Sequence, residues 1–250
     1  MTILTAWKYI GETPLQAMLR AINEHRLPTE NVNFCYTGRL DPMAQGMMVI
    51  LYGDEEVKLS NTHFNLSKKT YRFQAILGIS TTSYDPMGKI VDVAEVLPSE
   101  ANKFHKAMLE LGQTGKFKQF FPPCSAYKYK GQPLWVHAKN GTLPVIMPFK
   151  EREIYDIKSL NNPVNITVGQ YRKSCINDMH DVQEYNGEAF KCSEIIEDWL
   201  KLNRNISLWR FQYEVQVSSG TYVRSLVNDI AKQFGIPAHA FRITRVSVDN

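Results

Sequence analysis

The chain has 250 residues, of which 44% are hydrophobic and 22% are charged, and its formal net charge is +4. This is an ordinary soluble composition. No stretch is long and apolar enough to span a bilayer, and the N-terminus lacks the features of a secretory signal. We therefore expect a cytoplasmic protein with no membrane partner. The four cysteines and six histidines have the spacing of neither a metal site nor a disulfide framework, so we expect no bound metal.

The first predicted helix covers residues 14–24. Thr13 is suited to be its N-cap, Pro14 to be its first residue, and Gln16 completes a capping box. The apolar residues of this segment fall on one helical face, which we expect to pack against a core. They are Leu15, Met18, Leu19 and Ile22.

The stretch YTGRLDPMAQGM, residues 36–47, places Asp41 directly before Pro42 and a run of apolar residues. An Asp-Pro pair most often marks a turn, in which the carboxylate bonds nearby backbone amides. Taken alone, the stretch therefore predicts a turn without chemistry. A short buried strand is expected next, over residues 48–51.

The middle of the chain predicts a strand, a hairpin and a helix. From Tyr71 to Ile79 alternate residues are apolar, which is typical of a strand with one covered face. Turn residues then precede a second extended run, IVDV, so a hairpin is expected. Ser99 is placed to cap a helix that runs to Leu111, with Gly112 as its stop signal.

Residues 116–150 interleave lysines with aromatic residues and contain repeated Pro and Gly. Such a segment is better suited to a long loop than to a core. Lysine side chains reach phosphates and aromatic rings stack on unpaired bases, so the loop is a candidate RNA-binding surface. A solvated loop with its aromatic residues tucked beneath it explains the composition equally well.

The C-terminal part predicts a strand over residues 209–217, followed by a helix that ends at Gly235. Arg224 lies in the first turn of this helix, beside its apolar face, where the helix dipole disfavours a cation. We therefore expect a carboxylate near Arg224 that compensates for its charge. The apolar face consists of Val223, Leu226, Val227, Ile230, Ala231 and Phe234.

Four separated stretches of the chain combine to give a family signature. They are YTGRLDPMAQGMMVILYGDEEVK, KTYRFQAILGISTTSYDPMGKI, PPCSAYKYKGQPLWVHAKNG and SGTYVRSLVNDIAKQFGIPAHAFRITRV. In this order and at these distances they resemble the motifs of TruB-type tRNA pseudouridine synthases, as does the start around Lys8 and Gly11. The resemblance covers most of the chain outside about 161–207.

The resemblance implies one catalytic domain over residues 1–250, with a thumb-like loop over about 117–150. The implied fold is the mixed α/β (α+β) pseudouridine synthase fold. It has a twisted, mainly antiparallel mixed sheet, flanked by helices, with a central active-site cleft.

The resemblance also assigns the chemistry to Asp41. A buried carboxylate can act as nucleophile or base in the isomerisation of uridine to pseudouridine, without any cofactor. Pro42 and the apolar stretch after it would hold this carboxylate rigidly. Arg224 matches the arginine that pairs with the carboxylate and keeps it ionised and oriented. Tyr71 matches the tyrosine that stacks on the target base.

The other implied site residues contact the base or the RNA backbone. Tyr222 and Ile243 match positions that line the same pocket, although both could equally be core residues. Tyr36 replaces a family histidine that helps to fill the space left by the flipped base. Lys58 follows the catalytic strand and is either structural or RNA-facing. The phosphate contacts implied for the thumb-like loop are Lys128, Lys130 and Lys139.

The function implied by the resemblance is isomerisation of a uridine in the T-arm of tRNA, at the expected position 55, after the base is flipped out of the RNA. The implied partner is the tRNA T-arm stem-loop, and we expect a monomer. An alternative is a tRNA-binding or tRNA-folding protein on the same scaffold that has lost catalysis. The departures at Tyr36 and at Cys124, where the family usually has tyrosine, favour this alternative slightly.

Residues 161–207 have no family counterpart that we can match. We also expect the protein to lack the C-terminal RNA-binding domain that many bacterial members have. The 161–207 segment contains five basic and seven acidic residues, so we do not expect it to replace that domain as an RNA-binding module. Near its end, Ile195, Trp199 and Leu202 share one helical face. We expect this helix to dock on the catalytic body rather than on a partner protein.

Overall fold

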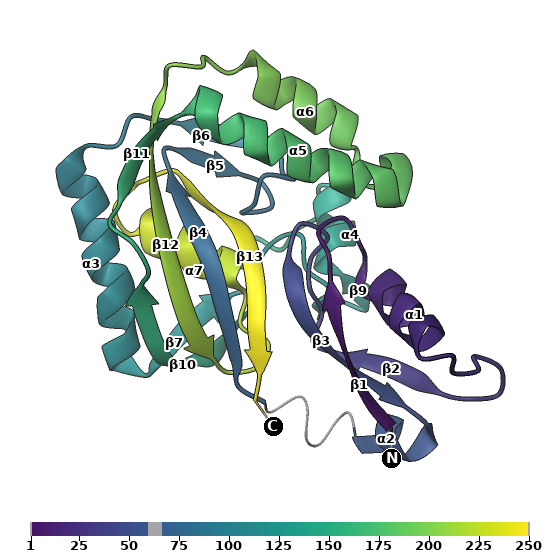
Figure 1. The fold of residues 1–250 in the computed structure, drawn as a ribbon. Coiled ribbons are helices and arrows are strands. Elements are labelled where there is room, and N and C mark those ends of the chain that lie inside the picture. Colours follow the sequence, from purple (N-terminus) through teal and green to yellow (C-terminus); the bar gives the residue numbers. More distant parts are fainter. Residues whose placement is uncertain (1, 60–66, 250) are drawn as a thin grey trace.

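The structure, a computed structural model, describes residues 2–59 and 67–249 and is drawn in Figure 1. Its largest element is a twisted, mixed sheet of nine strands. The strands are β1 (Thr2–Lys8), β2 (Phe34–Thr37), β3 (Gln45–Tyr52), β4 (Lys69–Leu77), β7 (Lys116–Phe120), β10 (Phe149–Ser159), β11 (Val164–Thr167), β12 (Ser207–Val217) and β13 (Ala238–Val248). They run in the order β1-β3-β13-β4-β12-β10-β7, with β2 paired to β3 and β11 paired to β12.

Helices flank this sheet, as the mixed fold predicted from the resemblance requires (Figure 1). They are α1 (Pro14–Glu24), α2 (Asp54–Leu59), α3 (Pro98–Thr114), α4 (Leu134–Lys139), α5 (Val168–Asn186), α6 (Cys192–Lys201) and α7 (Val223–Lys232), with a short 3₁₀ helix, η2 (Gly187–Phe190). Two small hairpins complete the fold: β5 (Ile79–Thr81) with β6 (Ile90–Val93), and β8 (Lys128–Tyr129) with β9 (Gln132–Pro133).

The nine-stranded sheet has two halves that meet at a short parallel contact. β3 pairs with β13 only through Thr244 with Gln45 and Arg245 with Gly46. The other pairings of this sheet are antiparallel. The loop from β2 to β3, which carries Asp41, therefore lies at the seam between the two halves.

Helix α1 has the bounds that its start signals predict. Thr13 caps it, and the capping box with Gln16 is complete. The predicted buried face is wrong for two residues, since Leu15 is 51% exposed and Leu19 is 41% exposed. The residues that are buried instead include two alanines, because small side chains allow the helix to lie close to the sheet. The buried set is Ala17, Met18, Ala21 and Ile22.

Helix α3 is longer than its sequence signals predict. Leu97, not Ser99, occupies the N-cap position, and the carboxylate of Glu100 accepts a hydrogen bond from the Leu97 amide at 2.8 Å. Gly112 lies inside the helix and does not stop it. A Cβ at Gly112 would lie 2.5 Å from the Ile157 side chain, so this glycine serves close packing of α3 on β10.

The lysine-rich and aromatic segment is more ordered than a long loop. β7 forms the edge of the sheet beside β10, where Phe149 pairs with Phe120. The Lys118 ammonium lies 3.7 Å from the centre of the Phe149 ring. The aromatic residues thus take part in strand pairing and cation–π contacts, and the loop prediction holds only for the intervening turns. The tip residues Val145 and Ile146 are highly exposed.

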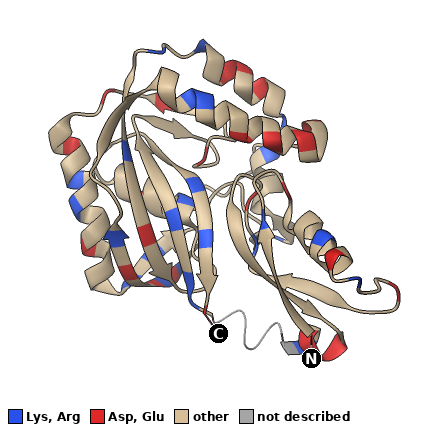
Figure 2. Cartoon of the chain, viewed as in Figure 1, with Lys and Arg blue, Asp and Glu red and all other residues tan. Residues whose placement is uncertain are grey.

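The helix predicted from Ile195, Trp199 and Leu202 docks on the catalytic body, as expected, and the rest of residues 161–207 packs there as well. β11 extends the sheet, and α5 and α6 lie across one end of it (Figure 1). Trp199 of α6 is fully buried, and its indole Nε1 donates to Pro86 O at 3.0 Å. The core cluster beneath α5 and α6 joins Met43, from the loop before β3, to residues of the C-terminal half of the sheet, among them Ile76 of β4 and Phe241 of β13. Figure 2 shows that acidic residues recur along these two helices.

The remaining predicted elements are present. The predicted strand from Tyr71 to Ile79 is divided at Gly78, so that β4 ends at Leu77 and Ile79 begins β5. The predicted hairpin is β5–β6, and residues 48–51 lie within β3. The C-terminal strand and helix are β12 and α7. Phe234 departs from the predicted apolar face, because α7 ends at Lys232 and Phe234 is 37% exposed.

Candidate active site

The backbone around Asp41 is held by several hydrogen bonds. The Asp41 carbonyl accepts from the Ala44 amide at 3.0 Å, which closes the turn that the Asp-Pro pair predicts. Pro42 O accepts from the Gly11 amide at 3.0 Å, and Lys8 Nζ donates to Ala44 O at 2.6 Å. Asp41 therefore projects from a fixed loop, with 39% of its side chain exposed.

Lys8 is an unusual residue for a protein interior, because it is fully buried. Its Nζ also donates to Pro42 O at 3.2 Å, so it bonds carbonyls on both sides of Met43. Burial lowers the pKa of Lys8 to about 7, and the nearby Asp41 partly opposes this shift. Through these hydrogen bonds, Lys8 holds the loop that carries Asp41 in a fixed conformation.

Arg224 lies in the first turn of α7 with a buried side chain. Its Nε donates to Asp41 Oδ2 at 2.8 Å. Nη1 donates to Ser83 O at 2.6 Å, and Nη2 donates to Cys124 O at 3.1 Å. Every nitrogen of the guanidinium thus has a partner, as a buried arginine requires. The carboxylate expected near Arg224 is Asp41, which is 183 residues away in the sequence.

A second carboxylate, Asp85, also faces Arg224. Its Oδ2 lies 3.6 Å from Arg224 Nε, while its Oδ1 accepts from the Met87 amide at 3.0 Å and from the Ser83 hydroxyl. Burial raises the pKa of Asp85, and Arg224 counteracts that shift. Burial disfavours the charge of Arg224, but Asp41 and Asp85 outweigh it and raise the pKa of the guanidinium.

The sequence predicts a turn around Asp85 but does not place this carboxylate in the site. One signal was present. The triplet Asp-Pro-Met occurs twice, at residues 41–43 and at residues 85–87. The structure brings both triplets to the same guanidinium, so the repeat marks two equivalent turns that present carboxylates.

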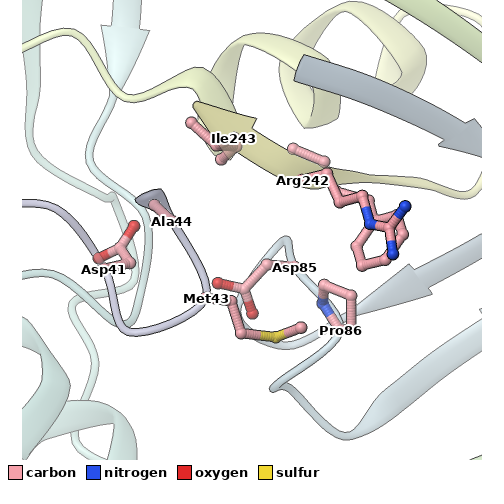
Figure 3. A pocket seen from close by; sticks show the side chains of 9 residues that line it. Asp41, Met43, Ala44, Asp85, Pro86, Arg242 and Ile243 are labelled. Carbon is pink, nitrogen blue, oxygen red and sulfur yellow. The ribbon is translucent and has the colours of Figure 1, made fainter. Parts of the chain in front are cut away.

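The two carboxylates line one small pocket, shown in Figure 3. Its volume is about 10 Å³, which is room for about one water molecule. The lining residues come from the two Asp-Pro-Met turns and from β13; they are Asp41, Met43, Ala44, Asp85, Pro86, Ala240, Phe241, Arg242 and Ile243.

Of the four predicted base-contacting residues, one lines this pocket and the other three do not. Ile243 lines it directly. Tyr71 on β4 is 7% exposed and shares a core cluster with Ile243. Tyr36 is half-buried and packs against that cluster. Tyr222 is the N-cap residue of α7, and burial raises the pKa of its hydroxyl, with a further contribution from Asp41.

The four predicted RNA-contacting lysines are all exposed and do not line the pocket. Lys58 lies in the last turn of α2, in the N-terminal half of the sheet. Lys128 belongs to β8, Lys130 follows it, and Lys139 ends α4. These last three occupy one compact segment that is distinct from the Asp41 loop.

Among residues 2–59 and 67–249, no group of three or more His, Cys, Asp or Glu side chains is arranged to hold a metal ion. Within the same ranges, none of the helices combines the length and the apolar character needed to cross a membrane.

The chain is similar to a family of RNA-modifying enzymes. Residues 26–176 match the family described as TruB family pseudouridylate synthase (N terminal domain). The chain is 30% identical to tRNA pseudouridine synthase B of Blochmanniella floridana over 85% of this chain and 64% of that protein. It is 28% identical to tRNA pseudouridine synthase 4 of Saccharomyces cerevisiae over 96% of this chain and 64% of that protein.

The chain thus spans just under two thirds of the length of these curated relatives. In fold it is similar to a chain of the crystal structure of a Cbf5-Nop10-Gar1 complex, with a TM-score of 0.54 and 15% sequence identity. That superposition covers 98% of this chain and 48% of the other chain. The matched family region contains both Asp-Pro-Met turns, and the chain belongs to the TruB family of pseudouridylate synthases.

Proposed function

We propose that this protein isomerises a uridine in the T-arm of tRNA, at the expected position 55, to pseudouridine. Asp41 is the catalytic carboxylate, and Arg224 is the positioning residue that keeps it ionised and oriented. Tyr71 stacks on the flipped base, Ile243 and Tyr222 form the walls of its pocket, and Tyr36 occupies the place that the base leaves. The reaction uses no cofactor.

The observation that carries this proposal is the asymmetric environment of the Asp41 carboxylate. Its Oδ2 is held at 2.8 Å by a guanidinium whose side chain is 3% exposed. Its Oδ1 accepts no hydrogen bond from the residues that the structure describes, and 39% of the side chain is exposed at the pocket. One oxygen thus fixes the geometry, while the other can reach a reacting atom.

A flipped base has to reach Asp41, whose side chain is 39% exposed and lines the pocket. Extruding a base from a folded RNA loop costs a few kcal/mol by general estimates, and stacking on Tyr71 recovers part of this cost. The pocket wall formed by Met43 and Ile243 consists of flexible or branched apolar side chains, which can move without leaving a charge unpaired.

The test is tritium release from tRNA that carries 5-tritiated uridine, followed by mapping of the modified position. Isomerisation replaces the bond from the ribose to uracil N1 by a bond to C5, and the hydrogen at C5 leaves for water. Asp41→Asn removes the charge without a change of size, so turnover should fall by orders of magnitude, while tRNA binding and folding stay near those of the parent.

Asp92→Asn is the matched control, because Asp92 is an exposed carboxylate on β6 outside the pocket. It should leave turnover unchanged. An Asp41→Asn rate within about tenfold of the parent rate would remove Asp41 from the mechanism. A parent that binds tRNA tightly but releases no tritium would instead favour a tRNA-binding or tRNA-folding role for this scaffold.

A further inference from the structure

The two Asp-Pro-Met turns share a structural support that their sequence does not reveal. Met43 is a buried member of the core cluster beneath α5 and α6, and Met87 packs against the same cluster. Each methionine lies two residues after one of the carboxylates that face Arg224. Both turns are therefore anchored in the packing surface of α5 and α6.

On the Asp85 side, the contact from α6 is direct. The buried Trp199 donates from its indole Nε1 to Pro86 O at 3.0 Å. Pro86 is the residue after Asp85 and also lines the pocket. This hydrogen bond ties the backbone of the turn to α6, and the indole also packs edge-to-face against the rings of Tyr171 and His239.

On the Asp41 side, α5 acts through Gly11. Asn186 at the end of α5 donates from Nδ2 to Gly11 O at 2.7 Å, and the Gly11 amide donates to Pro42 O at 3.0 Å. The approach is very close, since a Cβ at Gly11 would lie 2.6 Å from both Asp181 O and the Tyr185 ring. Gly11 has a φ of +92°, which favours glycine.

We propose that α5 and α6 form a positioning element for the isomerisation, which sets the spacing of Asp41 and Asp85 around Arg224 through Asn186 and Trp199. This inference rests on the proposed function. The recurrence of acidic residues on these helices in Figure 2 agrees with a positioning role rather than a phosphate-binding one. A carboxylate moved by about 1 Å from its productive place can cost a reaction 10²-fold in rate.

The test uses two conservative changes in the full-length protein. Trp199→Phe keeps most of the ring packing and removes the donor to Pro86 O, while Asn186→Ala removes the donor to Gly11 O. Each variant should lower the single-turnover rate at saturating tRNA by about tenfold or more. The Kd for tRNA should stay within about twofold, since neither side chain contacts RNA in this proposal.

The structure offers a matched control for each change. Trp209→Phe removes an equivalent indole donor, to Val96 O at 3.0 Å, on β12 outside the pocket. Asn177→Ala changes an exposed asparagine on the same helix α5. Both controls should keep the parent rate. Hydrogen exchange of the Gly11 amide, which bonds Pro42 O, should speed up in Asn186→Ala and not in Asn177→Ala.

The outcomes separate this inference from the proposed function. If the parent isomerises uridine and both variants keep the parent single-turnover rate, the positioning role is wrong and the proposed function stands. The positioning role is also wrong if Trp209→Phe slows the reaction as much as Trp199→Phe does, because the effect is then a general loss of packing. A parent without any isomerase activity overturns the proposed function, and the positioning role for that reaction falls with it.

Discussion

At the scale of single residues, Arg224 shows how burial and function are joined. A cation in the first turn of a helix is disfavoured by the helix dipole, and a buried charge requires close partners. Hydrogen bonds to Asp41, Ser83 O and Cys124 O offset the unfavourable helix dipole and supply the partners that the buried charge of Arg224 requires. Asp41, the carboxylate proposed for catalysis, is thus also a structural partner of Arg224. Substitutions have to be chosen so that the effect on turnover can be measured separately from the effect on stability.

Arg224→Ala should reduce both turnover and stability. It leaves the buried Asp85 without its cation and two backbone carbonyls without a donor, and breaking a buried pair commonly costs about 3–5 kcal/mol. Arg224→Lys should rescue only part of the loss, because lysine lacks the planar fork that reaches three partners. Denaturant unfolding and tritium release measure the two effects.

Arg72→Ala is the control for this prediction, since Arg72 forms an ion pair with Glu214 while 57% of its side chain is exposed. Exposed pairs contribute at most about 1 kcal/mol. If Arg224→Ala is no less stable than Arg72→Ala, then the buried pair does not have the structural role described above.

At the scale of elements, the segment from β7 to β10 combines an ordered edge of the sheet with exposed tips. Its lysines lie on β8, after β8 and at the end of α4, and they are exposed. None lines the pocket. Their expected role is thus to hold the RNA backbone while the base enters the site, which remains a proposal.

Neutralising Lys128, Lys130 and Lys139 together, by Lys→Gln, should weaken tRNA binding and flatten its salt dependence. Each phosphate contact contributes about 0.7–0.9 to the slope of log K against log salt concentration. The measurement is tRNA binding over a series of salt concentrations. A control triple on exposed helix positions, Lys103, Lys106 and Lys173, should leave the slope as in the parent. Equal slopes for the parent and for the triple variant at Lys128, Lys130 and Lys139 would show that other residues bind the RNA backbone.

At the scale of the whole molecule, α5 and α6 stabilise the sheet across its seam. Their core cluster joins Met43 from the Asp41 loop to Ile76 of β4 and Phe241 of β13. Helix α5 also reaches α1 of the N-terminal half, where Gln16 Nε2 donates to Tyr185 O at 3.1 Å. The short parallel contact between β3 and β13 is thus reinforced by packing from outside the sheet.

Trp199→Ala should therefore destabilise the entire fold. Truncating a fully buried tryptophan commonly costs about 3–5 kcal/mol, and here the cavity would open between α6 and the sheet. Thermal and denaturant unfolding measure the loss. Trp135→Ala removes a tryptophan that is 51% exposed on α4, and it should change the free energy of unfolding by no more than about 0.5 kcal/mol. Similar losses in the two variants would mean that α6 is not part of the main core.

The sequence by itself determined the elements whose signals are local. Capping at Thr13, the alternation in β12 and the apolar period of α7 depend on residues within a few positions of one another, so they could be predicted. The need for a carboxylate near Arg224 also followed from local helix electrostatics. The identity of that carboxylate as Asp41 came from the family resemblance.

Only the tertiary structure decided the features that depend on distant partners. Gly112 remains inside α3 because Ile157 packs against it, and Leu15 stays exposed because only a narrow face of α1 meets the sheet. Asp85 joins Asp41 at one guanidinium because the fold brings together two turns whose common support, α5 and α6, lies far along the chain. Local propensity acts over one or two turns of backbone, whereas these contacts join residues that approach one another only when the sheet is complete.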